Sequence, residues 1–196
     1  MLVVKYSSDK KNQWDEFIKS SKNGLFMFYR DYMEYHSDRF IDNSLMFYEN
    51  EKLISVFPAS VSDKVLLSHG GLTFGGFVTD SSMKQHHMND LFESLLNYSK
   101  QNDIQEIIYK QIPHIYHKIP AEEDLYSLFC INASINKVEA ATVIDLQNRP
   151  KIPKGRKAQI TRAKREGVVF EESYEFEKFI NLENDVLGEY HNATAV

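Results

Sequence analysis

The chain has 196 residues, of which 42% are hydrophobic and 26% charged, and its formal net charge is −5. This composition is ordinary for a globular protein, and no stretch is long and apolar enough to predict a membrane span. The start of the chain lacks the basic residues and apolar core of a signal peptide, so we expect a cytoplasmic protein. A single cysteine excludes an intramolecular disulfide framework, and the apolar neighbours of Cys130 predict a buried thiol.

The hydrophobic pattern predicts strands and helices that follow one another along residues 1–146. We expect strands at residues 2–6, 44–48, 52–60, 64–68, 104–110 and 138–146, and helices at residues 13–21, 29–40, 82–101 and 122–131. This order contains one strand, two helices, an antiparallel meander, and then alternating helices and strands. It predicts an α/β fold with a mixed sheet.

The region after residue 146 begins with a connector and then starts a second α/β unit. Prolines and a glycine among polar residues predict the connector, and a helix is expected at 156–166, a strand at 168–172 and a helix at 175–190. We therefore expect a first domain at 1–146, a linker at 147–155 and the incomplete start of a second domain at 156–196. The apolar face of the last helix needs more sheet than one strand supplies, so we expect the chain to be insufficient for catalysis by itself.

The segment 67–77 carries two glycine pairs around a short apolar stretch. Gly70-Gly71 and Gly75-Gly76 bracket Leu72, Thr73 and Phe74. Each pair permits a positive φ or a close backbone approach that alanine would oppose. Two interpretations are open: a tight structural turn with a bulge, or a loop that faces a ligand with His69 and Thr73.

The expected helix at 29–40 carries a polar face. Tyr32, His36 and Arg39 fall at i, i+4 and i+7, which would align a phenol, an imidazole and a guanidinium that can bind a carboxylate or phosphate. The alternative is a surface helix with ordinary salt bridges, in which an Arg30–Glu34 pair explains both residues.

A basic island lies on this acidic chain. Residues 149–165 contain eight basic side chains and no acid. Arg156 and Lys157 occupy the first turn of the expected helix, where the helix dipole disfavours cations but favours a phosphate. The island predicts a local anion site, although a solvated basic face would have the same composition.

Three strings together resemble bacterial GNAT-fold acyltransferases of the Fem type (FemAB-like), which have two domains. They are YRDYMEYHSDRF at 29–40, SHGGLTFGG at 68–76 and RKAQITRAKREGV at 156–168. The resemblance implies a GNAT-like domain at 1–146 followed by the start of a second one. It also implies an acyl-CoA or an aminoacyl-tRNA as donor. The Gln/Arg-x-x-Gly-x-Gly/Ala string that usually precedes the pyrophosphate-binding helix is absent before residue 82, so the donor is expected largely on the second domain.

The resemblance implies an acyltransferase that acts on an amine or hydroxyl of a cell-envelope precursor or sugar. The alternatives are a non-catalytic substrate- or partner-binding module and an RNA contact for a charged tRNA. A base would deprotonate the acceptor, and backbone N–H groups would stabilise the oxyanion. No tightly bound cofactor, metal or DNA is expected. The candidate general bases are His36 and His69; the candidate substrate-binding residues are Arg30, Tyr32, Asp38, Arg39, Ser68, Gly70, Gly71, Thr73, Gly75 and Gly76; the candidate phosphate-binding residues are Arg156, Lys157, Arg162, Lys164 and Arg165.

Overall fold

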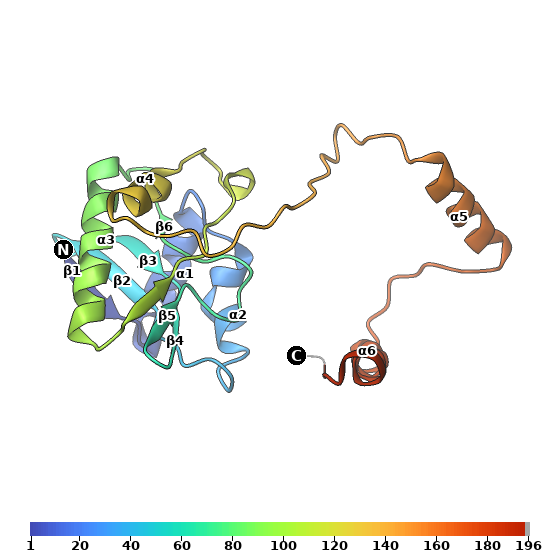
Figure 1. Cartoon of the computed structure of the whole chain (residues 1–196), viewed down its shortest axis with the longest axis horizontal. Helices are drawn as coiled ribbons and strands as arrows, with labels where there is room; N and C mark the ends of the chain where they lie inside the picture. Colours follow the sequence, from blue (N-terminus) through green and yellow to red (C-terminus); the bar gives the residue numbers. More distant parts are fainter. Residues whose placement is uncertain (195–196) are drawn as a thin grey trace. The chain divides into compact units, whose positions relative to one another are not determined.

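The computed structural model describes residues 1–194, and the chain divides into two units. Unit 1 is Met1–Lys137 and unit 2 is Val138–Val196. Unit 1 is a mixed α/β structure with two sheets, whereas the described part of unit 2 contains helices and connecting segments only (Figure 1). The α/β class expected from the sequence is therefore confirmed for unit 1.

The larger sheet of unit 1 is antiparallel throughout. It contains β1 (Leu2–Lys5), β2 (Leu45–Glu49), β3 (Lys52–Phe57) and β6 (Val78–Thr79), in the spatial order β1-β2-β3-β6. The β2–β3 hairpin turns at Asn50 and Glu51, which have φ values of 46° and 66°. This two-residue turn with positive φ matches the twist of antiparallel strands.

The smaller sheet joins β4 (Ser60–Ser62), β5 (Val65–Leu67) and β7 (Glu106–Ile108). β4 and β5 are antiparallel, whereas β5 and β7 are parallel. The single strand expected at 52–60 is in fact two strands in different sheets. Pro58 lies at the break, where its missing N–H cannot continue a ladder.

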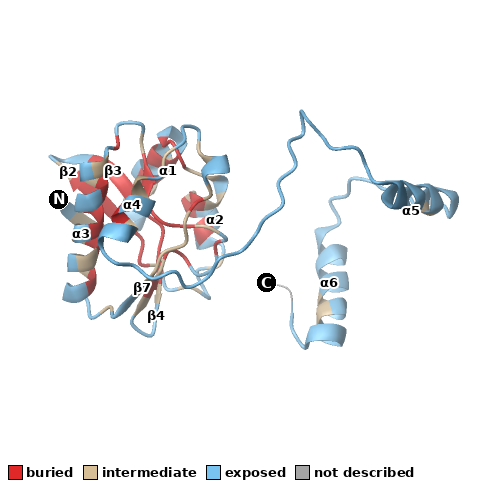
Figure 2. Ribbon diagram, turned by 45° about the horizontal axis from the view of Figure 1, so that its top comes forward, coloured by how far each residue is buried: buried red, intermediate tan, exposed pale blue. Residues whose placement is uncertain are grey.

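Helices cover both faces of the larger sheet. Alternate residues of β2 enter opposite cores, because successive side chains of a strand point to opposite faces. Met46 and Tyr48 pack with the buried side of α1 (Lys11–Ser20), whereas Leu45 and Phe47 pack with α3 (Gln85–Gln101). Buried residues are concentrated on these central strands and on the inner sides of the two helices (Figure 2).

The remaining helical segments of unit 1 are short. They are α2 (Arg30–Glu34), α4 (Glu123–Cys130) and the 3-10 turns at Ser8–Lys10, Phe26–Phe28 and His114–Tyr116. The helix expected at 29–40 is wrong in length, because α2 ends at Glu34. The next residues, Tyr35-His36-Ser37-Asp38, are weak helix formers and provide no buried side chain to hold another turn.

Unit 2 contains α5 (Lys154–Arg165) and α6 (Phe176–His191). Gly167, with a φ of 79°, follows the end of α5 as the sequence predicts. The strands expected at 138–146 and 168–172 do not form in the described structure. A strand needs a neighbour for its N–H and C=O groups, and none pairs with either segment there.

The cysteine of unit 1 also differs from its prediction. Cys130, which the sequence predicts to be buried, is exposed.

Candidate functional site

The second glycine pair of the 67–77 loop serves close packing. A methyl group on Gly75 would lie 1.9 Å from the carbonyl oxygen of Ser68, and one on Gly76 would lie 2.6 Å from the Tyr109 hydroxyl. Gly76 also has a φ of 82°. The structural interpretation of the loop therefore accounts for this pair, and both glycines are buried.

The first pair lies at the surface beside Phe40. A methyl group on Gly71 would lie 2.5 Å from the Phe40 ring, and the same ring contacts that of His69 at a centroid distance of 5.5 Å. The backbone N–H of Phe40 donates to the carbonyl of His36 at 3.2 Å. Phe40 thus joins the 36–40 turn to the glycine loop, and Gly70, Gly71 and Thr73 remain exposed there.

His69 is buried at the base of this loop, with a φ of 54°. Burial lowers its pKa to about 4; the charges of Arg30 and Lys110 act in the same direction, and Asp42 opposes them. The N–H of Gly71 donates to Nδ1 at 3.3 Å, so the neutral ring carries its proton on Nε2. At neutral pH His69 is consequently a hydrogen-bond donor and a poor proton acceptor.

Lys110 holds the loop in place by hydrogen bonds, and the sequence analysis did not identify it as a residue of the site. Its ammonium donates to the carbonyl of His69 at 2.5 Å and to that of Leu72, and its backbone N–H donates to the Ser68 hydroxyl at 2.6 Å. Burial lowers the Lys110 pKa. Its position within the strand expected at 104–110 was the only signal that could have placed it beside the loop.

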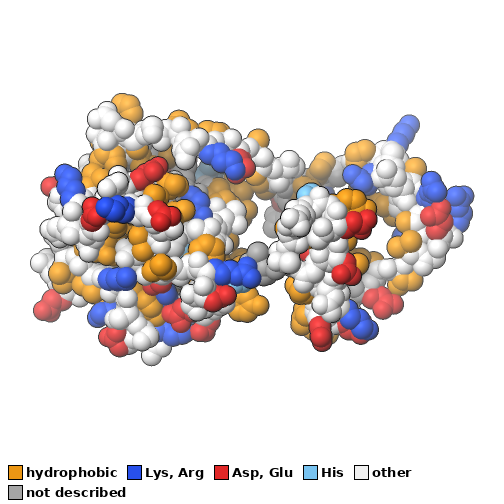
Figure 3. Space-filling model, turned by 60° about the horizontal axis from the view of Figure 1, so that its bottom comes forward, with side chains coloured by type: hydrophobic (Ala, Val, Ile, Leu, Met, Phe, Trp, Pro, Cys, Tyr) orange, Lys and Arg blue, Asp and Glu red, His pale blue; other side chains and the backbone are white. Residues whose placement is uncertain are grey.

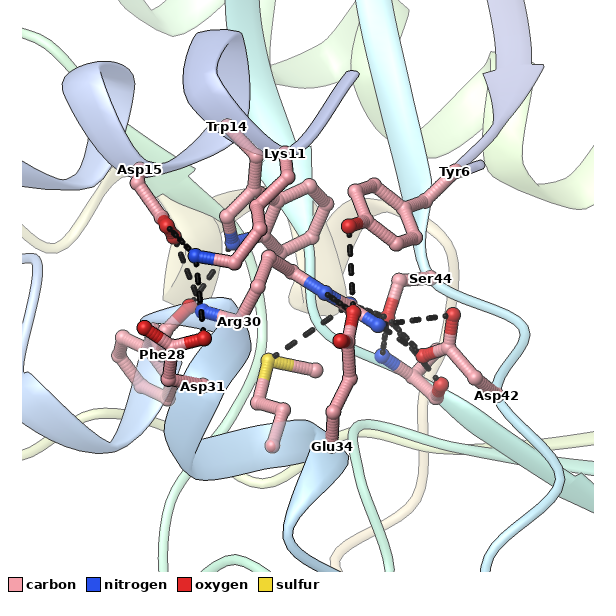
Figure 4. Close-up of polar contacts among 12 residues, drawn as sticks. Tyr6, Lys11, Trp14, Asp15, Phe28, Arg30, Asp31, Glu34, Asp42 and Ser44 are labelled. Atoms are coloured by element: carbon pink, nitrogen blue, oxygen red, sulfur yellow. Dashed lines mark hydrogen bonds and ion pairs between the residues drawn. The ribbon is translucent and has the colours of Figure 1, made fainter. Parts of the chain in front are cut away.

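Arg30 is the centre of a buried polar network (Figure 4). Its guanidinium pairs with Glu34 at 3.0 Å and Asp42 at 3.2 Å, and it lies 3.6 Å from the centroid of the Tyr6 ring. Only 2% of the Arg30 surface is exposed. The Arg30–Glu34 pair expected from the sequence is confirmed, and it accounts for Arg30 as a structural residue.

The polar face expected on residues 29–40 is not assembled, because the helix ends before His36. Tyr32 contacts the Phe26 ring at 5.3 Å, His36 contacts Tyr35 at 4.5 Å, and Arg39 pairs with Asp38 at 3.8 Å. Phe40 is therefore the residue of this segment that contacts the glycine loop, and Tyr32 stays exposed on α2.

A second polar cluster, absent from the sequence predictions, involves α4. The Tyr109 hydroxyl donates to Asp124 at 2.8 Å and accepts from the N–H of Phe77 at 3.1 Å. Burial raises the pKa of Asp124, and burial together with the Asp124 charge raises that of Tyr109. Both ring nitrogens of His117 are buried and have no hydrogen-bond partner among the described residues. Long-range packing creates this cluster, so local patterns could not indicate it.

The predicted phosphate-binding residues all lie on or within α5, where Lys and Arg side chains gather (Figure 3). Arg156 contacts Gln159 and Arg162 pairs with Glu166, both along the helix surface. The first turn of α5 contains no acid, and its N-cap makes no side-chain hydrogen bond. Its backbone N–H groups and cations are therefore available to an anion.

Two clefts of about 480 and 580 Å³ lie at the β2–β3 hairpin. Glu49 and Asn50 line both, and none of the predicted site residues lines either. Within residues 1–194, no group of three or more His, Cys, Asp or Glu side chains is placed to hold a metal ion. No helix in that range has both the length and the apolarity of a membrane span.

Comparison with known proteins gives weak likenesses only. No family model and no curated protein matches the chain. The solved structure of TTHA1254 from Thermus thermophilus aligns with 76% of this chain and 100% of its own, at 11% identity and a TM-score of 0.44. An aminoglycoside 6'-N-acetyltransferase from Acinetobacter haemolyticus aligns with 78% of this chain and 100% of its own, at 12% identity and a TM-score of 0.42. These scores are too low to assign a fold family or an activity.

Proposed function

We propose that the protein is an acyltransferase of the FemAB-like kind, which transfers an acyl or aminoacyl group to an amine or hydroxyl of a cell-envelope precursor or sugar. The proposal rests on the resemblance of the three strings and on the order of elements in unit 1. It retains a GNAT-like domain at 1–146, a linker at 147–155 and the start of a second such domain at 156–196. The donor is an acyl-CoA or an aminoacyl-tRNA, both of which carry phosphates.

The observation that carries this proposal is the cationic surface of α5. Lys157, Lys164 and Arg165 lie on one side of the helix and are exposed. Cations in a first turn are mildly unfavourable in isolation, but an anion there gains both the helix dipole and charge-assisted hydrogen bonds. A phosphate of the donor would therefore offset the unfavourable interaction between these cations and the helix dipole.

The chemistry is direct transfer. The acceptor nitrogen or oxygen attacks the acyl carbonyl carbon, and the tetrahedral intermediate collapses by expelling the CoA thiolate or the ribose oxygen of the tRNA. The acceptor proton passes to a base and then to the leaving group. We assign the base to His36, because the low pKa and occupied Nδ1 of His69 suit it to donate a hydrogen bond.

A non-catalytic binding module of GNAT fold is the second candidate. It is favoured by the state of His69 and by the early end of α2, which leaves His36 without an aligned Tyr32 and Arg39. In this case the exposed part of the glycine loop would hold a ligand without reacting with it.

Donor binding tests the role of α5. Fluorescence anisotropy with labelled aminoacyl-tRNA, and calorimetry with acetyl-CoA, would be compared for the wild-type chain and the Lys157→Glu/Lys164→Glu variant. We expect the variant to lose about tenfold in affinity for each removed phosphate contact. Lys178→Glu is the matched control, since it reverses a cation on α6, and should change affinity less than twofold. Equal loss in both variants, or none in either, would contradict the assignment.

Transfer itself separates the two candidate functions. A longer form of the protein would be incubated with labelled acetyl-CoA or aminoacyl-tRNA and envelope precursors. We expect transfer that His36→Ala abolishes and that His69→Asn largely retains. Binding without transfer for both donors would favour the non-catalytic module.

A further inference from the structure

Lys110 is a half-buried cation beside the glycine loop, and the groups that it contacts are neutral. Its ammonium donates to the backbone carbonyls of His69 and Leu72, and no ion pair within residues 1–194 includes it. Burial lowers the Lys110 pKa, and Asp42, the acid whose charge acts on His69, is paired with Arg30. A buried charge is unfavourable unless an opposite charge compensates it. Lys110 therefore supplies one positive charge that no carboxylate of the described structure neutralises.

The bonds from this ammonium fix the direction of two backbone N–H groups. In a trans peptide the C=O of one residue and the N–H of the next point in opposite directions, and the described chain has no cis peptide. Because the Leu72 carbonyl points toward Lys110, the N–H of Thr73 points away from it. The Gly70 N–H is turned away in the same manner and donates to the Ser60 hydroxyl at 2.8 Å. The N–H and hydroxyl of Thr73 have no hydrogen-bond partner in the described part of the chain.

Thr73 is exposed, but the residues on both sides of it are fixed. Leu72 is only 6% exposed and belongs to the core, and the Phe74 ring lies 5.4 Å from the Tyr116 ring. A donor that is held in place before binding loses less entropy than one on a mobile loop. The ammonium of Lys110 also polarises the peptide between Leu72 and Thr73, which strengthens its N–H as a donor. The loop thus presents a fixed and polarised donor at its surface.

We propose that Thr73 binds a carboxylate, with its backbone N–H and its hydroxyl as the two donors and Lys110 as the countercharge on the carbonyl side of the same peptide. One unpaired cation matches the single negative charge of a carboxylate better than the charge of about −2 on a phosphate. Hydrogen bonds from backbone N–H groups to an anion are stronger than those to a neutral acceptor. Lys110 is then a positioning residue. Since the proposed function assigns the donor phosphates to α5, the carboxylate belongs to the acceptor, and this last step rests on that function.

Amide NMR spectra test the site without any acyl donor. The 196-residue chain would be titrated with sodium acetate, and with sodium chloride at equal ionic strength as the control. We expect the Thr73 amide proton to move downfield and to saturate at about 10 mM acetate, an affinity suited to so small a ligand. The Gly70 amide, which is already bonded to Ser60, should move much less. Equal movement with chloride, or movement without saturation, would overturn the proposal. Tighter saturation by inorganic phosphate than by acetate would overturn the choice of a carboxylate.

Substitutions separate the two donors from the countercharge. Thr73→Val removes only the hydroxyl and should weaken acetate binding about fivefold, whereas Thr73→Ser keeps both donors and should bind within about twofold of wild type. Lys110→Met should weaken binding at least about tenfold. Lys100→Met, which removes an exposed charge of α3, should change it by less than about twofold. The near-ultraviolet signal of Trp14 verifies folding, and the Thr73 variants decide the matter if Lys110→Met is unfolded. Wild-type affinity in Thr73→Val and in folded Lys110→Met would contradict the proposal.

The acetate titration and the transfer assay can fail independently. Saturable acetate binding at Thr73 without acyl transfer would retain the carboxylate site and reject the transferase function. Transfer without acetate binding would retain the transferase function and reject the carboxylate site.

Discussion

The two units differ in how far their paired charged side chains are exposed to solvent. In unit 1, Arg30 is 2% exposed and is bound by two carboxylates and an aromatic ring, and Lys22 pairs with Glu123 with only 5% of its side chain exposed. In unit 2, the side chains of the Arg162–Glu166 pair are 73% and 53% exposed. Buried pairs are coupled to the fold, whereas exposed pairs contribute little to stability. Substitutions in unit 1 should therefore change unfolding, and those in unit 2 should change binding.

The largest difference is expected from removing an aromatic side chain. Trp14 is fully buried and its indole N–H donates to the Phe28 carbonyl at 2.8 Å, so Trp14→Ala should lower the free energy of unfolding by about 3–5 kcal/mol. Phe170 in unit 2 is fully exposed, and Phe170→Ala should change it by less than about 0.5 kcal/mol. Urea denaturation followed by circular dichroism measures both. If the two variants lost similar amounts of unfolding free energy, the predicted difference between the units would be wrong.

Glycine substitutions should differ in sign between the units. Gly75→Ala forces a methyl group against the Ser68 carbonyl and should destabilise unit 1 by about 3 kcal/mol. Gly188 lies inside α6 with no atom within 4 Å of an added methyl group, so Gly188→Ala should favour the helix by about 1 kcal/mol. Thermal unfolding and far-ultraviolet helicity report these changes. A tolerated Gly75→Ala would mean that the loop is open rather than packed.

The stability of unit 1 should also depend on pH through His69. The folded state binds the His69 proton more weakly than the unfolded state, because burial lowers the pKa from 6.5 to about 4. The free energy of unfolding should therefore be constant above pH 6.5, decrease as pH falls toward 4, and be about 2 kcal/mol lower at pH 5 than at pH 8 from this residue. His69→Asn retains a residue that tolerates positive φ and should reduce this dependence. An unchanged profile in the variant would assign the effect to other groups.

Local patterns predicted the elements whose apolar residues face a core. The spacing of Trp14, Phe17 and Ile18 indicated α1, and that of Met88, Leu91, Phe92 and Leu95 indicated α3, because burial of one face is what stabilises an amphipathic helix. The same reasoning failed for residues 29–40. The helical spacing of Tyr32, His36 and Arg39 continues there, but the residues after Glu34 do not pack into a core. It also failed for 138–146 and 168–172, where strand-forming residues have no paired neighbour in the described structure.

By itself the sequence determined the α/β class of unit 1, most helix positions, the acid-free basic helix and the Arg30–Glu34 pair, since each depends on residues close together in the chain. Only the tertiary structure decided that Arg30 is buried and that Gly75 packs against Ser68. It also decided that Lys110 hydrogen-bonds to the glycine loop and that Asp124 hydrogen-bonds to Tyr109. These contacts connect segments far apart in sequence, and their chemistry depends on burial. An imidazole has a pKa near 6.5 in water, and only burial, with the nearby charges of Arg30 and Lys110, lowers that of His69 to about 4 against the opposing charge of Asp42.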